Sequence, residues 1–290
     1  MSSEQTFSAL QRIARQESRA VQELLTLYAL ERFLARLVES AYADSFVLKG
    51  GVLLAGYGLR RPTRDVDMQA IDFILNEEHC RKVVAAVATA KADDGLIFDA
   101  NPTRIEQIRD EEEYSGLRVH VHANLYRAKI VVKLDISTGD PIFPNAQLVT
   151  MPQILGGEFT VMGHPPETII AEKAVTILQR GATSTRWRDY MDIRSLARSR
   201  NFNAAILRGA IEQVAKHRKV ELSAPSALLA DHDEVAQQKW EAWRRKTEVE
   251  DITLPILNDQ LTEVGKFLDP VFLGSSNPEV NWDSGLALWQ

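Results

Sequence analysis

The spacing of apolar residues changes character near residue 165. Before that point, short apolar or alternating runs predict β-strands, and longer stretches with a period near 3.6 residues predict helices. The predicted strands cover residues 46–49, 65–68, 96–98, 117–125 and 129–136, and a further hairpin is predicted within residues 145–163. The predicted helices of this part cover residues 7–40 and 77–91, with an acidic, solvated loop over residues 106–113.

After residue 165 the helical period dominates. Pro165 and Pro166 mark the change, and proline suits the first turn of a helix because its missing N–H is not needed there. The predicted helices cover residues 168–179, 186–198, 203–219, 231–248 and 253–268. We therefore predict an α+β protein, in which residues 1–164 form a mixed sheet with flanking helices and residues 165–290 form an all-helical C-terminal bundle.

The composition is that of a globular protein with an extensive core. Of 290 residues, 45% are hydrophobic and 26% are charged, which are ordinary proportions. No apolar run reaches the length of a membrane span, and the polar residues 1–5 lack a signal-peptide core. The single cysteine, Cys80, fits a reducing compartment. We expect a cytoplasmic protein without a membrane partner.

Three aspartates lie on predicted strands. Asp65 and Asp67 are two residues apart, so in an extended strand their carboxylates share one face. Asp135 lies on a later predicted strand, with Lys133 on the same face. Carboxylate oxygens are the ligands that Mg²⁺ takes together with substrate phosphates. The three aspartates, Asp65, Asp67 and Asp135, therefore predict a metal site.

A diglycine turn lies just before the first two aspartates. Gly50 and Gly51 follow Lys49 at the end of an apolar strand and precede a predicted short helix. Glycines leave backbone N–H groups unobstructed, and a helix N-terminus attracts anions. These residues predict a cradle for nucleotide phosphates.

Basic and hydroxyl side chains flank this turn. Arg60, Arg61 and Arg64 would balance the charge of a triphosphate, and Arg64 is nearest to the aspartates in sequence. Thr63 shares the strand face of Asp65, so its hydroxyl is placed to contact a phosphate or to be modified.

Together these residues predict nucleotidyl transfer from a nucleoside triphosphate (NTP). A hydroxyl attacks the α-phosphate while pyrophosphate leaves, and two Mg²⁺ ions held by carboxylates stabilise both oxygens. Asp135 would help to deprotonate the attacking hydroxyl, and Lys133 would contact substrate or neutralise carboxylate charge. A nucleotide-sugar glycosyltransferase also uses two aspartates at this spacing, but a βαβ unit would precede them. Here one long predicted helix precedes the diglycine strand.

Basic residues gather in one part of an acidic chain. The formal net charge is −6, yet residues 172–219 contain eleven Lys or Arg against four Asp or Glu. Such a surplus suits a polyanion such as RNA, although solvated arginines on a helix bundle give the same count. Trp187 and Tyr190 are the aromatic residues of this stretch best suited to stacking on an unpaired base.

The order of four motifs resembles a known family. The sequences LKGG…RRPTRDVDM, VKLDIS, AEKAVTILQR and RWRDYMDI are similar to those of the AbiEii/MenT nucleotidyltransferase toxins of type IV toxin–antitoxin systems. The resemblance runs from about Ser45 to Leu196, and later residues match only as a helical region. It implies the polymerase-β-like nucleotidyltransferase fold. Many members of that superfamily carry serine where this chain has Gly51.

The resemblance also implies roles for individual residues. The three aspartates would bind two Mg²⁺ ions and take part in catalysis. Lys173 would contact the nucleotide phosphates, and Asp189 would be the acidic residue of the fourth motif. From the residues alone, Lys173 is typical of a surface lysine, and Asp189 of a helix cap or an ion-pair partner of Arg186.

As the resemblance implies, the protein would transfer nucleotides from an NTP to the 3′ acceptor end of tRNA, and the base of that NTP would be a pyrimidine. This would block aminoacylation and growth, and a cognate AbiEi/MenA-type antitoxin would restrain it. Two alternatives stay open: a nucleotidyltransferase acting on a small molecule or protein, and a non-catalytic nucleotide-binding regulator. The residues indicate no oligomeric state.

Overall fold

The computed structural model describes residues 1–71, 73–102, 104–109, 115–181, 186–229, 234–274 and 277–290. The chain divides into two compact units. The first consists of Met1–Gly139 and Gln147–Gly163, and the second consists of Asp140–Ala146 and His164–Gln290. The short segment 140–146 therefore belongs to the second unit although its sequence neighbours on both sides belong to the first. The boundary between residues 164 and 165 stays a prediction for independently folding domains.

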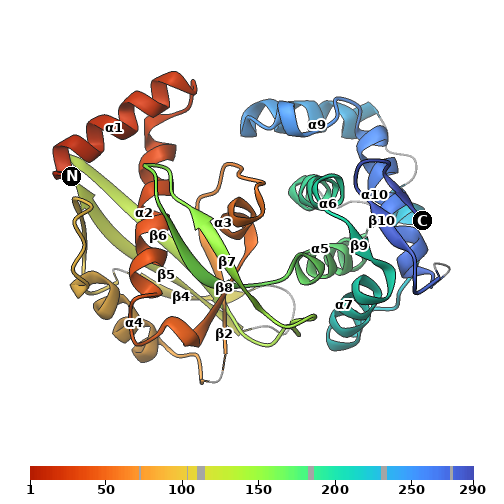
Figure 1. Cartoon of the computed structure of the whole chain (residues 1–290), viewed down its shortest axis with the longest axis horizontal. Coiled ribbons are helices and arrows are strands. Elements are labelled where there is room, and N and C mark those ends of the chain that lie inside the picture. Colours follow the sequence, from red (N-terminus) through yellow and green to blue (C-terminus); the bar gives the residue numbers. More distant parts are fainter. Residues whose placement is uncertain (72, 103, 110–114, 182–185, 230–233, 275–276) are drawn as a thin grey trace. The chain divides into compact units, whose positions relative to one another are not determined.

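The first unit is built on a mixed sheet. Its strands are β1 (Phe46–Lys49), β2 (Val66–Ala70), β3 (Leu96–Phe98), β4 (Arg104–Arg109), β5 (Ser115–Leu125), β6 (Ala128–Ser137), β7 (Gln147–Pro152) and β8 (Glu158–Gly163). They run in the order β3-β5-β6-β2-β1-β8-β7, and β4 also pairs with β5. The β2–β6 and β1–β8 pairs are parallel. Its helices are α1 (Ser3–Gln16), α2 (Val21–Leu37), α3 (Gly50–Leu53) and α4 (Glu77–Thr89) (Figure 1).

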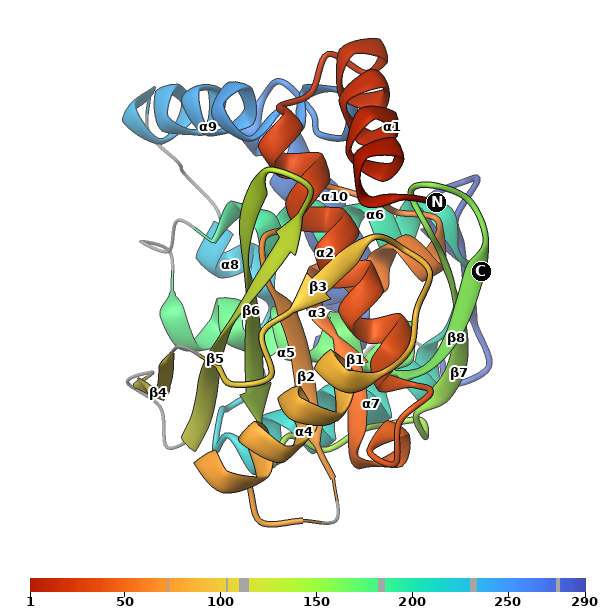
Figure 2. The ribbon, with the colours of Figure 1, turned by 90° about the vertical axis from the view of Figure 1, so that its left-hand side faces the viewer.

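The sheet has a buried face and a polar face because its strands alternate. In β6, Ile130, Val132, Leu134 and Ile136 are buried, whereas the intervening side chains are partly or fully exposed. Helices α2 and α4 cross the buried face (Figure 2). The polar face of β6 carries the odd-numbered residues, including Asp135.

The N-terminal helical segment differs from its prediction. One helix over residues 7–40 is predicted, but α1 and α2 are separated by residues 17–20. Ser18 adopts a φ of +54°, a left-handed conformation that ends a run of helical hydrogen bonds. Because glycine usually occupies such a position, the sequence carries no clear signal for the break.

A strand replaces part of the predicted acidic loop over residues 106–113. Residues 104–109 form β4, in which Ile105 lies opposite Val119 of β5. Charged side chains on β4 are compatible with an edge strand, so their abundance is a poor guide to a loop. Residues 110–113 of this prediction lie outside the described residues.

The second unit is mainly helical. Its helices are α5 (Pro166–Arg180), α6 (Trp187–Ser199), α7 (Ala204–His217), α8 (Pro225–Leu229), α9 (Glu234–Thr247) and α10 (Leu257–Phe272). Strands β9 (Phe202–Asn203), β10 (Asn281–Asp283) and β11 (Leu288–Trp289) form a small sheet in the order β11-β10-β9. The helix predicted over residues 231–248 is α9, and residues 231–233 lie outside the described residues.

The small sheet is the feature that the all-helical prediction omits. Its strands have two or three residues, too few to show a period of two. Aromatic packing fixes it: the Trp282 and Trp289 rings both contact Phe267 of α10. The indole N–H of Trp282 donates to the Ala197 carbonyl over 2.6 Å. The α+β class, with a mixed sheet followed by a helical region, is confirmed.

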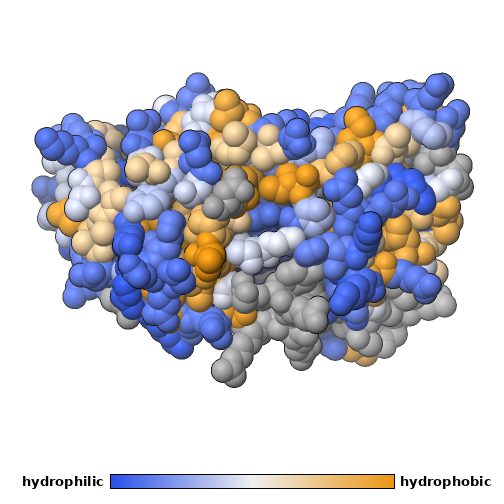
Figure 3. All heavy atoms as spheres, turned by 90° about the horizontal axis from the view of Figure 1, so that it is seen from below, coloured by the Kyte–Doolittle hydropathy of each residue, from blue (hydrophilic) through white to orange (hydrophobic). Residues whose placement is uncertain are grey.

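The face seen in Figure 3 is mainly hydrophilic, with separate hydrophobic patches between the hydrophilic residues. Among the helices of the described residues, none has both the length and the apolar character that a bilayer crossing requires.

Candidate active site

The polar face of the first unit's sheet carries a row of charged residues, one from each of five strands. Lys49 of β1 lies opposite Asp67 of β2, and Asp67 lies beside Asp135 of β6. Asp135 lies opposite Arg118 of β5, which lies opposite Glu106 of β4. Residues in register on neighbouring strands project from the same face. These five residues are called the charged row below.

Asp135 is held by a two-pronged ion pair. Arg118 donates from Nε to Oδ1 of Asp135 over 2.7 Å and from Nη2 to Oδ2 over 2.6 Å. These hydrogen bonds raise the pKa of the Arg118 guanidinium, and the charges of Asp135, Asp65 and Glu106 add to the effect. Paired donors of this kind match both carboxylate oxygens and fix the plane of the carboxylate. The carboxylate of Asp135 is therefore oriented by β5.

Arg118 is a site residue that the sequence analysis missed, because its partner depends on the length of the turn between β5 and β6. The turn between β5 and β6 has two residues, so Leu125 lies opposite Ala128. A two-residue turn fixes the register of both strands. Counting back from this observed turn places Arg118 opposite Asp135, whereas the connection predicted over residues 126–128 is one residue longer and would place Arg118 opposite Ile136.

Asp65 and Lys133 are placed differently from each other. Asp65 lies in a bend immediately before β2, so the predicted strand face shared with Asp67 does not extend to it. Its charge nevertheless acts on Arg118. Lys133 shares the polar face with Asp135 and lies opposite His120 of β5, and its side chain is exposed.

The diglycine turn fits closely around Asp67 and Thr63. Gly50 has a φ of +67°, and a Cβ atom built there would overlap the Asp67 carboxylate. A Cβ atom on Gly51 would overlap the Thr63 hydroxyl and lie 2.9 Å from Nη1 of Arg61. Glycine is therefore required at residue 50 by both conformation and space, and at residue 51 by space. The serine common in the wider superfamily would not fit at Gly51 beside Thr63.

The residues that flank the diglycine turn, 60–64, include both buried and exposed side chains. Thr63 is buried at 4% exposure, and Nη1 of Arg61 donates to its hydroxyl over 3.3 Å. Arg60 donates to Glu31 and to the Pro152 carbonyl, which gives it a structural role. Arg64 is exposed, in keeping with its predicted availability to substrate.

The oxygen ligands on this face suit a hard divalent cation such as Mg²⁺. Asp67 and Asp135 project from neighbouring positions, and Asp65 adds a third carboxylate just before β2. In the described part of the chain, no three His, Cys, Asp or Glu side chains gather closely enough to share one ion. The type of donor therefore fits Mg²⁺, while both oxygens of Asp135 already accept hydrogen bonds from Arg118.

The remaining predicted site residues, Lys173 and Asp189, belong to the second unit. Nζ of Lys173 on α5 lies 2.8 Å from Asp189 and 2.8 Å from Asp192, both on α6. Nε of Arg186 donates to Asp189 over 2.6 Å. Burial acts to raise the pKa of Asp189, but Lys173 and Arg186 lower it below its ordinary value.

Asp192 is a second residue missed by the sequence analysis. It is 1% exposed and lies one helical turn after Asp189, so the two carboxylates share one helix face. Lys173 holds two buried carboxylates and is not the free surface lysine that its sequence alone suggests.

The basic surplus of residues 172–219 is largely neutralised. Among the described residues, at least six of its eleven cations pair with carboxylates: Lys173, Arg186, Arg194, Arg198, Arg208 and Arg218. The interpretation as a polyanion site is weaker for this reason. Trp187 and Tyr190, predicted to stack on a base, are 8% and 1% exposed, so their rings are occupied by core packing.

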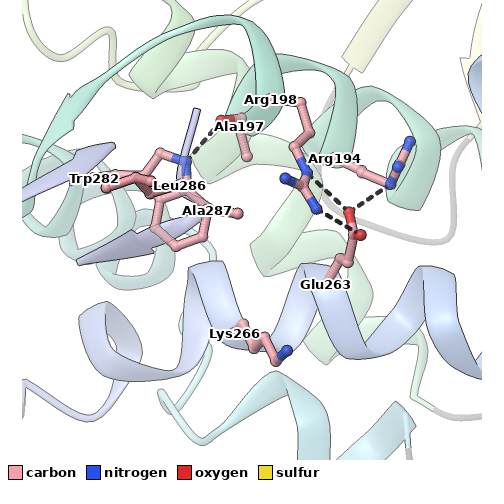
Figure 4. Close-up of a pocket in the computed structure, with 8 residues that line it drawn as sticks. All are labelled: Arg194, Ala197, Arg198, Glu263, Lys266, Trp282, Leu286 and Ala287. Carbon is pink, nitrogen blue, oxygen red and sulfur yellow. Dashed lines mark hydrogen bonds and ion pairs between the residues drawn. The ribbon is translucent and has the colours of Figure 1, made fainter. Parts of the chain in front are cut away.

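A cavity of about 180 Å³ in the second unit contains none of the predicted site residues. It lies among α6, α10 and the small sheet (Figure 4). On one side, Glu263 accepts hydrogen bonds from Arg194 and Arg198. Trp282 lies on another side, with its indole N–H bonded to the Ala197 carbonyl.

A comparison with protein families identifies one that covers most of this chain. The family model described as nucleotidyl transferase AbiEii toxin, type IV toxin–antitoxin system, matches residues 32–263. No curated protein matches the chain. Among solved structures, a candidate nucleotidyltransferase from Helicobacter pylori is 20% identical, with a TM-score of 0.47, and the match covers 87% of this chain and 97% of that one. JHP933 from Helicobacter pylori is 20% identical, with a TM-score of 0.44, and the match covers 84% and 92%.

The family match begins before β1 and ends within α10, so it extends beyond the motif region at residues 45–196 at both ends. It includes the diglycine turn, the three aspartates, Lys173 and Asp189. The chain therefore belongs to the AbiEii family of nucleotidyl transferase toxins of type IV toxin–antitoxin systems.

Proposed function

We propose that this toxin transfers nucleotides, preferably a pyrimidine nucleotide, from an NTP to the 3′ acceptor end of tRNA in the cytoplasm. The modified tRNA would no longer be aminoacylated, and growth would stop until a cognate AbiEi/MenA-type antitoxin restrained the enzyme. Membership of the AbiEii family supports the nucleotidyl transfer and the antitoxin partner. The adjacent carboxylates of Asp67 and Asp135 on one sheet face are the structural observation that supports the chemistry.

In this proposal the polar face of the sheet binds the triphosphate. The backbone N–H groups of Gly50 and Gly51 would contact the phosphates, since glycine has no side chain to block their approach. Lys49, Arg64 and Lys133 supply positive charge around the phosphates. Bound Mg²⁺, two ions in this reaction class, would stabilise the charge that develops on the attacking and leaving oxygens.

The carboxylates have separate parts in this proposal. Asp65 and Asp67 would hold the cations, together with Asp135. Asp135 would also accept the proton of the attacking 3′ hydroxyl. Lys173 would contact the nucleotide phosphates, with Asp189 holding its ammonium group in place.

The acceptor is the part of the proposal that the family does not define. Neutralisation of much of the basic surplus favours a smaller acceptor, such as a small molecule, as the second candidate. Two exposed basic residues, Lys133 on the polar face of β6 and Arg64 in the segment before β2, favour a nucleotide there under either alternative.

The test is transfer of label from each of the four NTPs, α-labelled, with Mg²⁺ and total tRNA. Parallel reactions contain bulk protein or an aminoglycoside in place of tRNA. We expect labelled tRNA with CTP or UTP, and sequencing of tRNA 3′ ends should show added pyrimidines. Asp67→Asn should abolish the label, while Asp93→Asn, at a side chain 97% exposed, should not. Label on a small molecule alone would replace the tRNA assignment, and no label with any acceptor would refute the proposal.

A further inference from the structure

The ion pair between Arg118 and Asp135 raises the question of why a carboxylate proposed to bind a cation is already bound by one. Both oxygens of Asp135 accept from Arg118. Glu106 also lies opposite Arg118, on β4, but it pairs with Arg104 and with Nε2 of His120 at 3.1 Å. The guanidinium of Arg118 is therefore directed at Asp135, through the hydrogen bonds from Nε and Nη2.

Electrostatics explains the arrangement. Asp67 and Asp135 are neighbours on parallel strands, and two carboxylates at such a spacing repel each other unless cations lie nearby. In the charged row, Lys49 lies beside Asp67, and Arg118 lies beside Asp135. The two cations balance the two anions. Arg118 thus supplies at Asp135 the positive charge that a divalent ion would supply.

The guanidinium cannot release Asp135 by losing a proton, because arginine stays charged at all physiological pH values. It can release Asp135 only by moving away. The Arg118 side chain is 39% exposed, whereas that of Asp135 is 15% exposed. The arginine therefore has access to water on its outer side, and the aspartate is the more enclosed partner.

We propose that Arg118 is a positioning residue that competes with the divalent cation for Asp135. In the nucleotide-free protein it fixes the plane of the Asp135 carboxylate. A cation that binds at Asp135 must displace the guanidinium, so cation affinity is kept low until substrate arrives. The inference rests on the proposed function, because it takes Asp135 to be a cation ligand.

The experiment is a Mn²⁺ titration of the full-length protein without nucleotide, with free Mn²⁺ measured by electron paramagnetic resonance. We expect Arg118→Gln to bind Mn²⁺ about tenfold more tightly than the wild type, equivalent to about 1.4 kcal/mol. Arg118→Lys should bind Mn²⁺ about threefold more tightly than the wild type, because an ammonium group keeps the charge but cannot span both oxygens of Asp135. A merely structural role would give the opposite sign, since a disturbed site binds more weakly.

Arg104→Gln is the matched control. It removes one arginine from the same sheet face, at a residue that pairs with Glu106 and not with Asp135. We expect its Mn²⁺ affinity to stay within twofold of the wild type. An equal gain in Arg104→Gln and Arg118→Gln would overturn the inference, because a general change in charge would then explain both.

The outcomes also separate this inference from the proposed function. If the wild type binds Mn²⁺, Asp67→Asn weakens binding and Arg118→Gln leaves it unchanged, only the competition is wrong. If neither the wild type nor Arg118→Gln binds Mn²⁺ at millimolar concentration, the competition is overturned, and the transfer of label from NTPs decides the proposed function separately. Labelling of the buried Cys80 checks that each variant is folded. Should Arg118→Gln fail that check, Arg118→Lys decides, and an affinity no higher than that of the wild type would overturn the inference.

Discussion

Gly50 shows how strictly one residue of the first unit is determined. Its φ of +67° and the Asp67 carboxylate beside its Cα leave no room for a side chain. Gly58 has a similar φ of +79°, but a Cβ atom there would meet nothing within 4 Å. The two glycines therefore separate the cost of conformation from the cost of displacing a proposed cation ligand.

We predict that Gly50→Ala lowers nucleotidyl transfer at least about 100-fold, because a displaced ligand of this kind costs about that much. Gly58→Ala should keep transfer within about threefold, although both variants carry the cost of a left-handed alanine, about 1–2 kcal/mol. Transfer rates and Cys80 labelling in urea measure the two effects. Equal loss of transfer in both variants would contradict the proposed role of Asp67 as a cation ligand.

Tryptophan and cysteine lie in different units, so each serves as a probe for the unfolding of one unit. All five tryptophans lie between residues 187 and 289, in the second unit, and the single cysteine lies in the first. Cys80 is buried, and burial raises the pKa of its thiol to about 11, so it reacts slowly while α4 stays packed. Fluorescence therefore reports unfolding of the second unit, and thiol labelling reports unfolding of the first.

At the scale of elements, α5 and α6 are joined by Lys173 and two buried carboxylates. The Lys173 side chain is 15% exposed, and those of Asp189 and Asp192 are 5% and 2% exposed. Removing the shared cation leaves both carboxylates without it in the interior, which is costly. Loss of toxicity in a Lys173 variant would therefore not by itself demonstrate a contact with nucleotide.

We predict that Lys173→Met destabilises the second unit by about 3–5 kcal/mol, the usual cost of breaking a buried ion pair. The measurement is urea unfolding followed by tryptophan fluorescence. Lys266→Met, at an exposed lysine on α10, is the control and should change stability by less than about 0.5 kcal/mol. A stability near that of the wild type for Lys173→Met would show that the carboxylates find other partners.

The same pair predicts a pH dependence. Lys173 and Arg186 lower the pKa of Asp189 against the effect of burial, so the folded protein binds this proton less tightly than the unfolded chain does. The stabilisation is present above the unfolded pKa, about 4, and is lost as pH falls through the folded value. The stability difference between wild type and Asp189→Asn should be largest at pH 7 and shrink toward pH 3.

Unfolding of both proteins by urea at several pH values, followed by tryptophan fluorescence, measures this difference. Asp251→Asn, at an exposed aspartate of the second unit, should show no comparable pH dependence relative to the wild type. A difference for Asp189→Asn that grows as the pH falls would reverse the assigned sign.

At the scale of the whole molecule, the second unit depends on a segment from the middle of the chain. Arg218 donates to both carboxylate oxygens of Asp140 over 3.0 and 2.9 Å, and both side chains are 9% exposed. Gly209 of α7 lies against the Phe143 ring, where a Cβ atom would be 2.8 Å from the ring edge. Residues 140–146 are thus packed into the second unit.

We predict that Asp140→Asn lowers the stability of the second unit by about 3 kcal/mol, because Arg218 loses a nearly buried partner. Tryptophan fluorescence in urea should show this loss. Cys80 labelling should stay within twofold of the wild type, since the first unit keeps its own contacts. A fluorescence transition at the wild-type urea concentration would contradict the assignment of residues 140–146 to the second unit.

How much of this the sequence could predict depends on the range of the interactions. The β5–β6 hairpin and the helices α4 to α7 follow from local periodicity, and their predicted bounds lie within a few residues of the observed ones. The pairing of Asp67 with Asp135 required the order of strands that are far apart in sequence, which periodicity does not contain. The break at Ser18 and the small sheet around Trp282 depend on single conformations and tertiary packing.

The site shows the same division. The diglycine turn and the three aspartates are readable as a motif, and their assignment to catalysis stays a prediction. The residues that pair with the motif were not predicted. Predicting Arg118 requires the register of β5 against β6, and predicting Asp192 requires knowing which face of α6 is buried. Burial of Tyr190 likewise reflects packing that a count of aromatic residues cannot show.

The passage of residues 140–146 into the second unit also affects how the protein is made. When the ribosome has synthesised the first 139 residues, β1 has its partner β2 in the chain, but its other neighbour, β8, ends only at Gly163. We therefore expect an open edge at β1 until β8 has been synthesised, which is a hazard for aggregation. Neither unit is one continuous stretch of sequence, so neither can be completed before synthesis of the other has begun.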